Sequence, residues 1–175
     1  MTTMQASPGI KKLVLLGAGH AHVQVLARLA QERPANLDVT LVSPYPFQTY
    51  SGMVPGLVAG HYTQAECQIA LEPLVRAARA RWLPARCIGV VPQDNTVQLA
   101  AIKPVSDPAV VPETLHYDLL SIDTGAVLDR ARLAQDIPGA PENALIVRPI
   151  EVFARLWPEV LVLAQTRPLA VAVIG

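Results

Sequence analysis

A short apolar run that stops at two glycines constrains the fold most strongly. Residues 13–22 read LVLLGAGHAH, and the valine- and leucine-rich part from Lys12 to Leu16 predicts a buried strand. Apolar residues then recur at helical spacing from His20 to Gln31, so we expect a helix directly after the glycines. Asp38–Val42 (DVTLV) predicts a second strand. Strand, glycine turn, helix and strand make a βαβ unit, whose strands should be parallel and whose crossover should be right-handed.

The glycines match most of a dinucleotide-binding turn, G-x-G-x-x-G. Gly17 makes the tight turn and Gly19 lets the backbone approach a pyrophosphate, whereas His22 stands where the third glycine would permit close helix–strand packing. We therefore expect the helix to lie slightly farther from the strand. Amide groups at the helix start can still attract an anion. After the second strand, Ser43 stands where a carboxylate usually holds a ribose, and its hydroxyl is a weaker partner.

Two histidines follow the glycines. His20 and His22 lie two positions apart, so on a helix they point in different directions and do not form a metal clamp. His20, at the helix start, is placed to touch a phosphate or the edge of a flavin. We interpret His22 as a packing or capping residue, and neither histidine is favoured as a catalytic base.

The middle of the chain mixes loop and regular segments. A long loop rich in proline and glycine is predicted for 43–61, followed by a helix from about 65 to 82. Two β-like runs, 86–91 and 96–101, flank the turn sequence PQDN and predict a hairpin. Three prolines predict a surface loop over 103–114.

The last third of the chain predicts further strands and one helix. YDLLSI at 117–122 indicates a buried strand, and a short strand is expected near 144–147. A helix is predicted from about 150 to 165, broken or kinked at Pro158. PLAVAVIG at 168–175 repeats the opening pattern of an apolar strand that ends at a glycine.

Composition excludes several classes of protein. The chain has 175 residues, 51% hydrophobic and 16% charged, with a formal net charge of zero, as expected of one domain with a real core. It has no basic stripe, so nucleic acid is not an expected partner. Prolines and glycines interrupt the longest uncharged stretch, which excludes a transmembrane segment there, and no signal-like segment opens the chain. We expect a cytoplasmic protein. Cys67 and Cys87 lack the C-x-x-C spacing of a redox pair and are interpreted as free thiols.

Four segments together resemble a known family. LLGAGHAHVQVL, VTLVSPYPFQTYSGMVPGLVAGHY, IALEPL and YDLLSIDTGA resemble, in this order, the amino-terminal FAD domain of pyridine nucleotide-disulfide oxidoreductases. The likeness is strongest to the NADH dehydrogenase-like branch associated with selenide, water dikinase. Such proteins are more than twice as long, with an FAD domain split around an inserted NAD(P)H domain. The resemblance implies a Rossmann-like α/β FAD-binding segment over 1–167 and, at 168–175, the first strand of a missing NAD(P)H-binding domain.

The resemblance also implies which residues bind FAD. They fall into five groups along the chain, from the pyrophosphate turn to the exit from the domain. The pyrophosphate would lie on Gly17, Ala18, Gly19, His20 and Ala21, and the adenosine ribose on Ser43 and Pro44. The flavin would lie along Tyr50, Ser51, Gly52 and Met53. The adenine would lie by the strand of Cys87, and Thr124 and Gly125 would make the closing contacts. No metal ligand and no catalytic residue is implied.

Three functions remain open from the sequence. The first is the FAD-binding segment of a flavin-dependent oxidoreductase that carries electrons from NAD(P)H through FAD to a quinone or similar acceptor. This segment would be incomplete by itself, because NAD(P)H is a substrate only with the inserted domain present. The second is a non-enzymatic nucleotide-binding or interaction module. The third is a methyltransferase, against which YDLLSIDTGA followed by IPGA argues. An exposed apolar final strand would also favour self-association.

Overall fold

The structure, a computed structural model, describes residues 9–102 and 113–174, which divide into two compact units. The first unit comprises residues up to 48 together with 69–125, and the second comprises 49–68 together with the residues from 126 onward. Most of the loop predicted over 103–114 and the end of the final predicted strand, Gly175, lie outside the described residues. Each unit is described by itself.

A four-stranded parallel sheet forms the centre of the first unit. Its strands, in spatial order, are β5 (Arg81–Leu83), β2 (Leu37–Val42), β1 (Lys11–Leu16) and β9 (Leu119–Ile122). Leu16, the last residue of β1, pairs with Val42 on one side and with Ile122 on the other. The carboxyl ends of β1, β2 and β9 therefore lie at one edge of the sheet, and the predicted parallel βαβ unit is confirmed.

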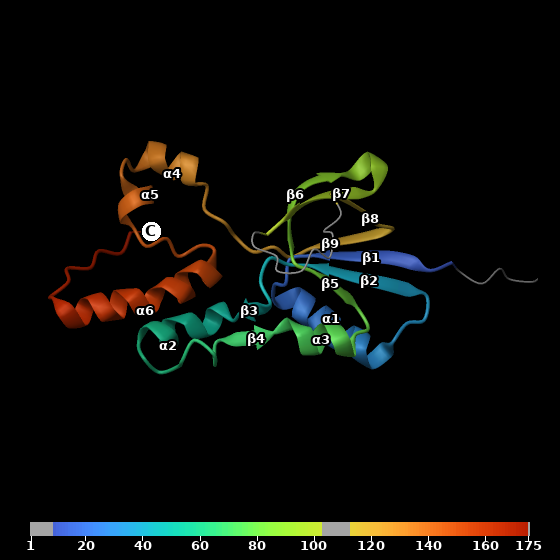
Figure 1. Cartoon of the computed structure of the whole chain (residues 1–175), viewed down its shortest axis with the longest axis horizontal. Helices are drawn as coiled ribbons and strands as arrows, with labels where there is room; N and C mark the ends of the chain where they lie inside the picture. Colours follow the sequence, from blue (N-terminus) through green and yellow to red (C-terminus); the bar gives the residue numbers. More distant parts are fainter. Residues whose placement is uncertain (1–8, 103–112, 175) are drawn as a thin grey trace, which may run out of the picture. The chain divides into compact units, whose positions relative to one another are not determined.

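Two different layers cover this sheet (Figure 1). One face carries the helices α1 (His20–Glu32) and α3 (Leu71–Ala77). The other carries an antiparallel sheet of β6 (Ala85–Val91), β7 (Thr96–Ala101) and β8 (Thr114–His116), with the short 3-10 helix η2 (Pro92–Asp94) at the β6–β7 turn. The hairpin predicted around PQDN is thus confirmed, and the unit is an α/β fold with the layers of a Rossmann-like domain.

Each face of β1 contributes to a separate hydrophobic core. Leu15 packs with Leu41 of β2 and Leu26 of α1 on the helical side, and all three are at most 1% exposed. Val14 and Leu16 pack on the other side, in the cluster of the antiparallel sheet. Successive side chains of a strand point to opposite faces, so a strand buried on both faces must be apolar throughout. This is why LVLL at 13–16 reads as an unbroken hydrophobic run.

The second unit is helical. It contains the 3-10 helix η1 (Ser51–Met53) and the helices α2 (Val54–Val58), α4 (Arg130–Asp136), α5 (Ala140–Asn143) and α6 (Ile150–Thr166). Val54 of α2 packs against Ile150 and Phe153 of α6, and Leu57 of α2 packs against Cys67 and Ala154. The strands β3 (Phe47–Thr49) and β4 (Gln68–Ala70) pair as a short ribbon where the chain passes from one unit to the other. None of the helices in the described part of the chain has the length and apolarity to span a bilayer.

The predictions for 43–82 are partly wrong. The segment predicted as a loop contains β3, η1 and α2, and the helix predicted from about 65 to 82 is divided among β4, α3 and β5. Arg79 adopts a left-handed conformation (φ 53°) directly after α3, which ends the helix. Trp82 then pairs with Leu41 of β2, so its apolar ring belongs to a sheet strand.

Two predictions near the carboxyl terminus are wrong: the strand near 144–147 and a break of the last helix at Pro158. Residues 144–147 form no strand. Residues 168–174 have no pairing partner among the described segments, and Val173 is 93% exposed, so their place as the first strand of a further domain stays a prediction. A strand needs such a partner for its backbone groups. The helix α6 also continues through Pro158, although proline removes one backbone hydrogen bond. Phe153 and Trp157 stack with ring centroids 5.8 Å apart and hold the turn before the proline.

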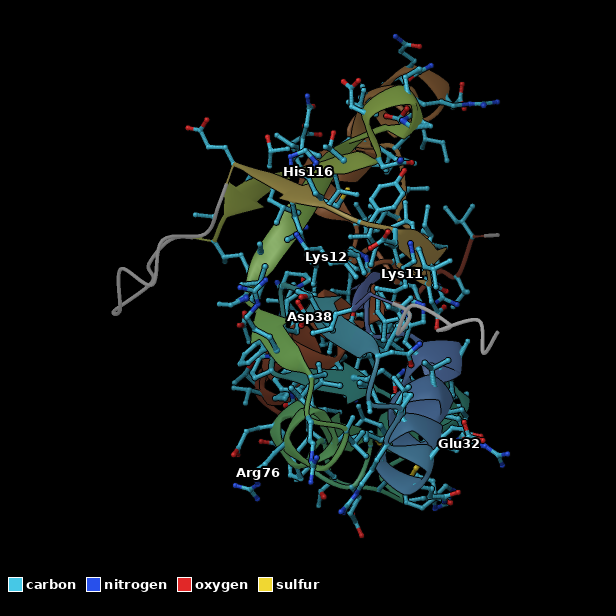
Figure 2. The ribbon with its side chains drawn as sticks, turned by 90° about the vertical axis from the view of Figure 1, so that its right-hand side faces the viewer. Lys11, Lys12, Glu32, Asp38, Arg76 and His116 are labelled. Atoms are coloured by element: carbon cyan, nitrogen blue, oxygen red, sulfur yellow. The ribbon has the colours of Figure 1, made fainter. Side chains whose placement is uncertain are left out.

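Charged groups lie at the amino-terminal end of the parallel sheet. Lys11 and Lys12 begin β1 there (Figure 2). The Asp118 carboxylate accepts hydrogen bonds from the Lys12 backbone N–H at 2.8 Å and from Lys11 Nζ at 3.0 Å. These bonds hold the pKa of Asp118 below its ordinary value. Asp118 thereby fixes the start of β9 beside the start of β1, at the end of the sheet opposite the β1–α1 turn.

Candidate functional site

The candidate site is built on the turn between β1 and α1. Gly17 has φ 85° and donates its N–H to the Val42 carbonyl at 2.8 Å, so the turn begins at the end of β2 as well as β1. Gly19 is the N-cap of α1, and no side chain of the helix's own first turn caps it. Without a serine, threonine or aspartate at the N-cap, the first amides of α1 need partners from elsewhere.

The end of β9 supplies two of these partners. The Asp123 carbonyl accepts from the Gly19 N–H, and its carboxylate oxygen Oδ2 accepts from the His22 N–H, both at 3.1 Å. The Asp123 N–H in turn donates to the Leu16 carbonyl at 2.8 Å. One residue after β9 thus ties the last residue of β1 to the start of α1. Asp123 has no role among the predictions from the sequence; an acidic residue directly after a buried parallel strand is the signal for this capping role.

Asp123 also explains why both fingerprint positions are glycine. A β-carbon at Gly17 would lie 2.6 Å from the Asp123 carbonyl carbon and from Thr124 Cα. A β-carbon at Gly19 would overlap the Asp123 carboxyl group. The residues that follow β9 therefore come close enough to the turn to require glycine at both positions. The pattern is weaker evidence of a bound pyrophosphate than the sequence alone suggests.

His22 occupies the third fingerprint position as a buried bridge. Its side chain is 1% exposed, with Nδ1 2.7 Å from the Gly17 carbonyl oxygen and Nε2 2.9 Å from Ser121 Oγ. A carbonyl can only accept, so Nδ1 carries a proton and donates it to Gly17, while Nε2 is the partner of the Ser121 hydroxyl. The interpretation of His22 as a packing residue is confirmed. No group of three possible metal ligands occurs among the described residues.

Two amides of the turn remain open to a ligand. The backbone N–H groups of Ala18 and Ala21 have no acceptor among the described residues. Ala21 is exposed, and Ala18 is partly exposed at the start of the turn. His20, between them, is exposed, and its Nδ1 lies 3.4 Å from Gln48 Nε2. Open amides at the start of a 13-residue helix attract an anion.

Ser43 and Pro44 follow β2 at the same edge of the sheet as the turn. Ser43 is 3% exposed, and its hydroxyl is engaged with the Tyr45 backbone, donating to the carbonyl at 3.2 Å and accepting from the N–H at 3.4 Å. Its carbonyl accepts from Trp82 Nε1 at 3.1 Å. Ser43 therefore holds the loop after β2 in place, and Pro44 is the more accessible of the two.

The other predicted residues fall into separate places. Thr124 and Gly125 are exposed directly after β9, beside the glycine turn. Cys87 lies on β6, half-buried against the antiparallel core, where the pairing with β7 shifts register between Cys87 and Gly89. Residues 50–53 belong to the second unit, where Tyr50 precedes η1 and donates its N–H to the Cys67 carbonyl at 2.7 Å.

We expect the two thiols to differ in reactivity. Cys67 is fully buried, and burial raises its pKa, whereas Cys87 is half-buried on a strand. Since the thiolate is the nucleophile, Cys87 should react with a disulfide reagent at least about tenfold faster, and Cys67 should react mainly on unfolding. Peptide mass spectrometry after timed labelling measures both rates. Cys87→Ser should remove the fast phase, and equal rates for both thiols would contradict the prediction.

Comparison with known proteins identifies the fold. No protein-family model matches the chain, and no curated protein matches it. Among solved structures, NDH2 from Plasmodium falciparum in complex with NADH matches with a TM-score of 0.69 and 22% identity, covering 92% of this chain and 31% of its own. Sulfide:quinone oxidoreductase from Aquifex aeolicus matches with a TM-score of 0.64 and 21% identity, covering 90% of this chain and 33% of its own.

A third match is the reduced CoADR-RHD from Bacillus anthracis, with a TM-score of 0.63 and 17% identity, covering 87% of this chain and 27% of its own. The chain thus spans about a third of the length of the structures it matches. At these identities the likeness establishes the Rossmann-like α/β fold predicted from the sequence.

Proposed function

We propose that the chain is the FAD-binding segment of a flavin-dependent NAD(P)H oxidoreductase, of the NADH dehydrogenase-like kind associated with selenide, water dikinase. The observation that carries the proposal is the pair of open amides, Ala18 and Ala21, at the start of α1 in a fold shared with an NADH-bound NDH2. The motif resemblance supports the same reading. In the whole protein, electrons would pass from NAD(P)H through FAD to a quinone or similar acceptor.

The turn fits a diphosphate on its own chemistry. Diphosphate oxygens accept hydrogen bonds, and the amides of Ala18 and Ala21 offer donors where the helix end is positive. Pro44 would border the adenosine ribose, while the Ser43 hydroxyl holds the loop. When bound, FAD would supply hydride and electron transfer; these residues bind and orient it. Residues 50–53, Cys87, Thr124 and Gly125 remain proposed contacts of the same cofactor.

The proposed domain organisation follows from the same family resemblance. Residues 1–167 would form the FAD-binding segment, and 168–175 would be the first strand of an NAD(P)H-binding domain. We also propose a cytoplasmic location and self-association through the apolar residues 171–174, of which Val171 is 77% exposed.

A non-enzymatic interaction module is the second candidate. It is favoured by one observation: Asp123 and Thr124 already account for the requirement for glycine at positions 17 and 19. If the turn serves only to pack β9 against α1, the chain binds no dinucleotide. The two candidates therefore differ in whether the turn holds a diphosphate.

Flavin titrations distinguish the candidates. We expect the purified chain to bind FAD and to bind riboflavin, which lacks the diphosphate and the adenosine, at least tenfold more weakly, as measured by isothermal titration calorimetry. Ala21→Pro removes one donor where a helix tolerates proline, and it should weaken FAD binding about tenfold, in line with a hydrogen bond to a charged group.

The matched control is Ala21→Ser, which keeps the N–H and should retain FAD affinity within about twofold. Circular dichroism checks that both variants keep the helix content of the parent chain. Absence of FAD binding, or equal binding of FAD and riboflavin, would favour the interaction module.

A further inference from the structure

The candidate phosphate site contains a negative charge of its own. The Asp123 carboxylate bonds the His22 N–H at 3.1 Å and lies so close to Gly19 that a β-carbon there would overlap it. A ligand phosphate on the neighbouring amides of Ala18 and Ala21 would therefore share the helix start with a carboxylate. A dinucleotide-binding turn is expected to present only positive charge to its ligand. A carboxylate at this turn should therefore affect which kinds of phosphate bind there.

We propose that Asp123 makes the turn selective for diphosphate diesters, such as dinucleotides, over nucleotides that end in a free phosphate. The proposal rests on the proposed function. A diester phosphate carries one negative charge, whereas a terminal phosphate, with a second pKa near 6, carries about 1.5 to 2 charges at pH 7. The extra charge of a terminal phosphate is repelled by the carboxylate, and both ligand types offer the same oxygens to the amides.

The geometry supports a fixed charge at this place. Asp123 is held through three hydrogen bonds: its N–H to Leu16, its carbonyl from Gly19, and its carboxylate from His22. Because the backbone on either side is tied to β1 and α1, the carboxylate cannot withdraw without losing the cap of the helix. The N–H groups of Gly19 and His22 already donate to Asp123 and are not available to a ligand. The ligand must therefore bind through the N–H groups of Ala18 and Ala21.

Among the described residues, no lysine or arginine forms an ion pair with Asp123. His20 lies on the turn itself, and its Nδ1 is 3.4 Å from Gln48 Nε2. The first turn of α1 contains no acidic residue, so Asp123 provides the negative charge at this helix end. Lys11 and Lys12 are the first residues of β1 and lie at the opposite end of the sheet (Figure 2).

The test compares ADP with ADP-ribose, which share the adenosine diphosphate and differ in whether the second phosphate is terminal. In the parent chain, ADP-ribose should bind more tightly than ADP at pH 7.5 and low salt. Asp123→Asn keeps an oxygen that accepts from the His22 N–H and removes the charge. We expect this variant to raise the affinity for ADP about fivefold more than the affinity for ADP-ribose. Repulsion of one extra unit charge near a protein surface lowers an affinity by about that factor.

Asp118→Asn is the matched control. Asp118 and Asp123 flank the same strand, β9, so both variants change the net charge equally, but Asp118 lies at the other end, about 16 Å away at 3.3 Å per residue. That separation exceeds the Debye length of about 10 Å at 0.1 M salt, so the ADP to ADP-ribose ratio should stay unchanged.

Calorimetric affinities of FAD, ADP and ADP-ribose for the three proteins decide the outcome. If FAD binds to the parent chain and Asp123→Asn leaves the ADP to ADP-ribose ratio within twofold, the selectivity proposal is overturned and the proposed function stands. If none of the three ligands binds either the parent chain or Asp123→Asn, the proposed function fails and this inference fails with it. A shift confined to Asp123→Asn supports both.

Discussion

Gly17→Ala is expected to lower the free energy of unfolding of the first unit by about 3–5 kcal/mol. Gly17 has φ 85°, which costs a residue with a β-carbon about 1–2 kcal/mol. The new β-carbon would also lie 2.6 Å from the Asp123 carbonyl carbon, in a residue whose backbone bonds Leu16 of β1 and Gly19 at the start of α1. Neither strand can give way without breaking the pairing of β1 with β9, so strain and overlap add.

Urea unfolding measures this loss, followed by the fluorescence of Trp82, which lies in the first unit. A Trp157→Phe background removes the other tryptophan of the chain. Gly125→Ala is the matched control, since Gly125 has φ 73° but nothing within 4 Å of the added β-carbon. It should cost only the strain of about 1–2 kcal/mol. Equal losses for both variants would show that overlap with Asp123 does not constrain the turn.

The second large effect is expected at His22. Replacing His22 with alanine should destabilise the first unit by about 2–4 kcal/mol, because it opens a cavity and leaves the Gly17 carbonyl and the Ser121 hydroxyl without the imidazole. His22→Asn should recover part of the loss. Its amide N–H₂ can reach the Gly17 carbonyl as Nδ1 does, although it cannot reach Ser121.

The same fluorescence-detected urea unfolding measures the His22 variants. His20→Ala, two residues away, removes an exposed imidazole and should cost less than about 1 kcal/mol. A His22→Ala chain as stable as His20→Ala would mean that the buried bridge contributes nothing to the packing of α1 on the sheet.

The sequence predicts the opening βαβ unit well because several independent signals agree there. An unbroken apolar run, a glycine turn, helical spacing and a second apolar run all specify β1, α1 and β2 within one residue at each end. The β6–β7 hairpin is likewise specified by alternating side chains around PQDN. Local pattern suffices where burial and turn chemistry point to the same element.

Prediction fails where pairing across the chain decides the structure. In the sequence, Trp82 and its neighbours continue the helical spacing of α3. In the structure they pair with β2 and form β5. The apolar residues at 168–174 stay a predicted strand, because a strand forms only with a partner. Helical periodicity near 65–82 also hides Arg79, whose left-handed conformation ends α3.

The candidate site shows the same division. Gly17, Gly19 and His22 are identified by their spacing, and the burial of His22 follows from its position on the helix. The role of Asp123 was not predicted, since it depends on β9 lying beside β1, a pairing of residues more than a hundred positions apart. Ser43 is expected beside a ribose, and the bonds of its hydroxyl to the Tyr45 backbone are a local feature that the sequence does not reveal.

The bridge from His22 to Ser121, together with the cap from Asp123, has a consequence for how this fold can be cut or recombined. The opening βαβ unit is not an autonomous building block, since its loop is finished by residues made about a hundred positions later. A transplanted fragment ending at residue 42 would lack the contacts that shape the loop between its strand and helix. During synthesis, the loop likewise acquires its final form only after β9 has emerged.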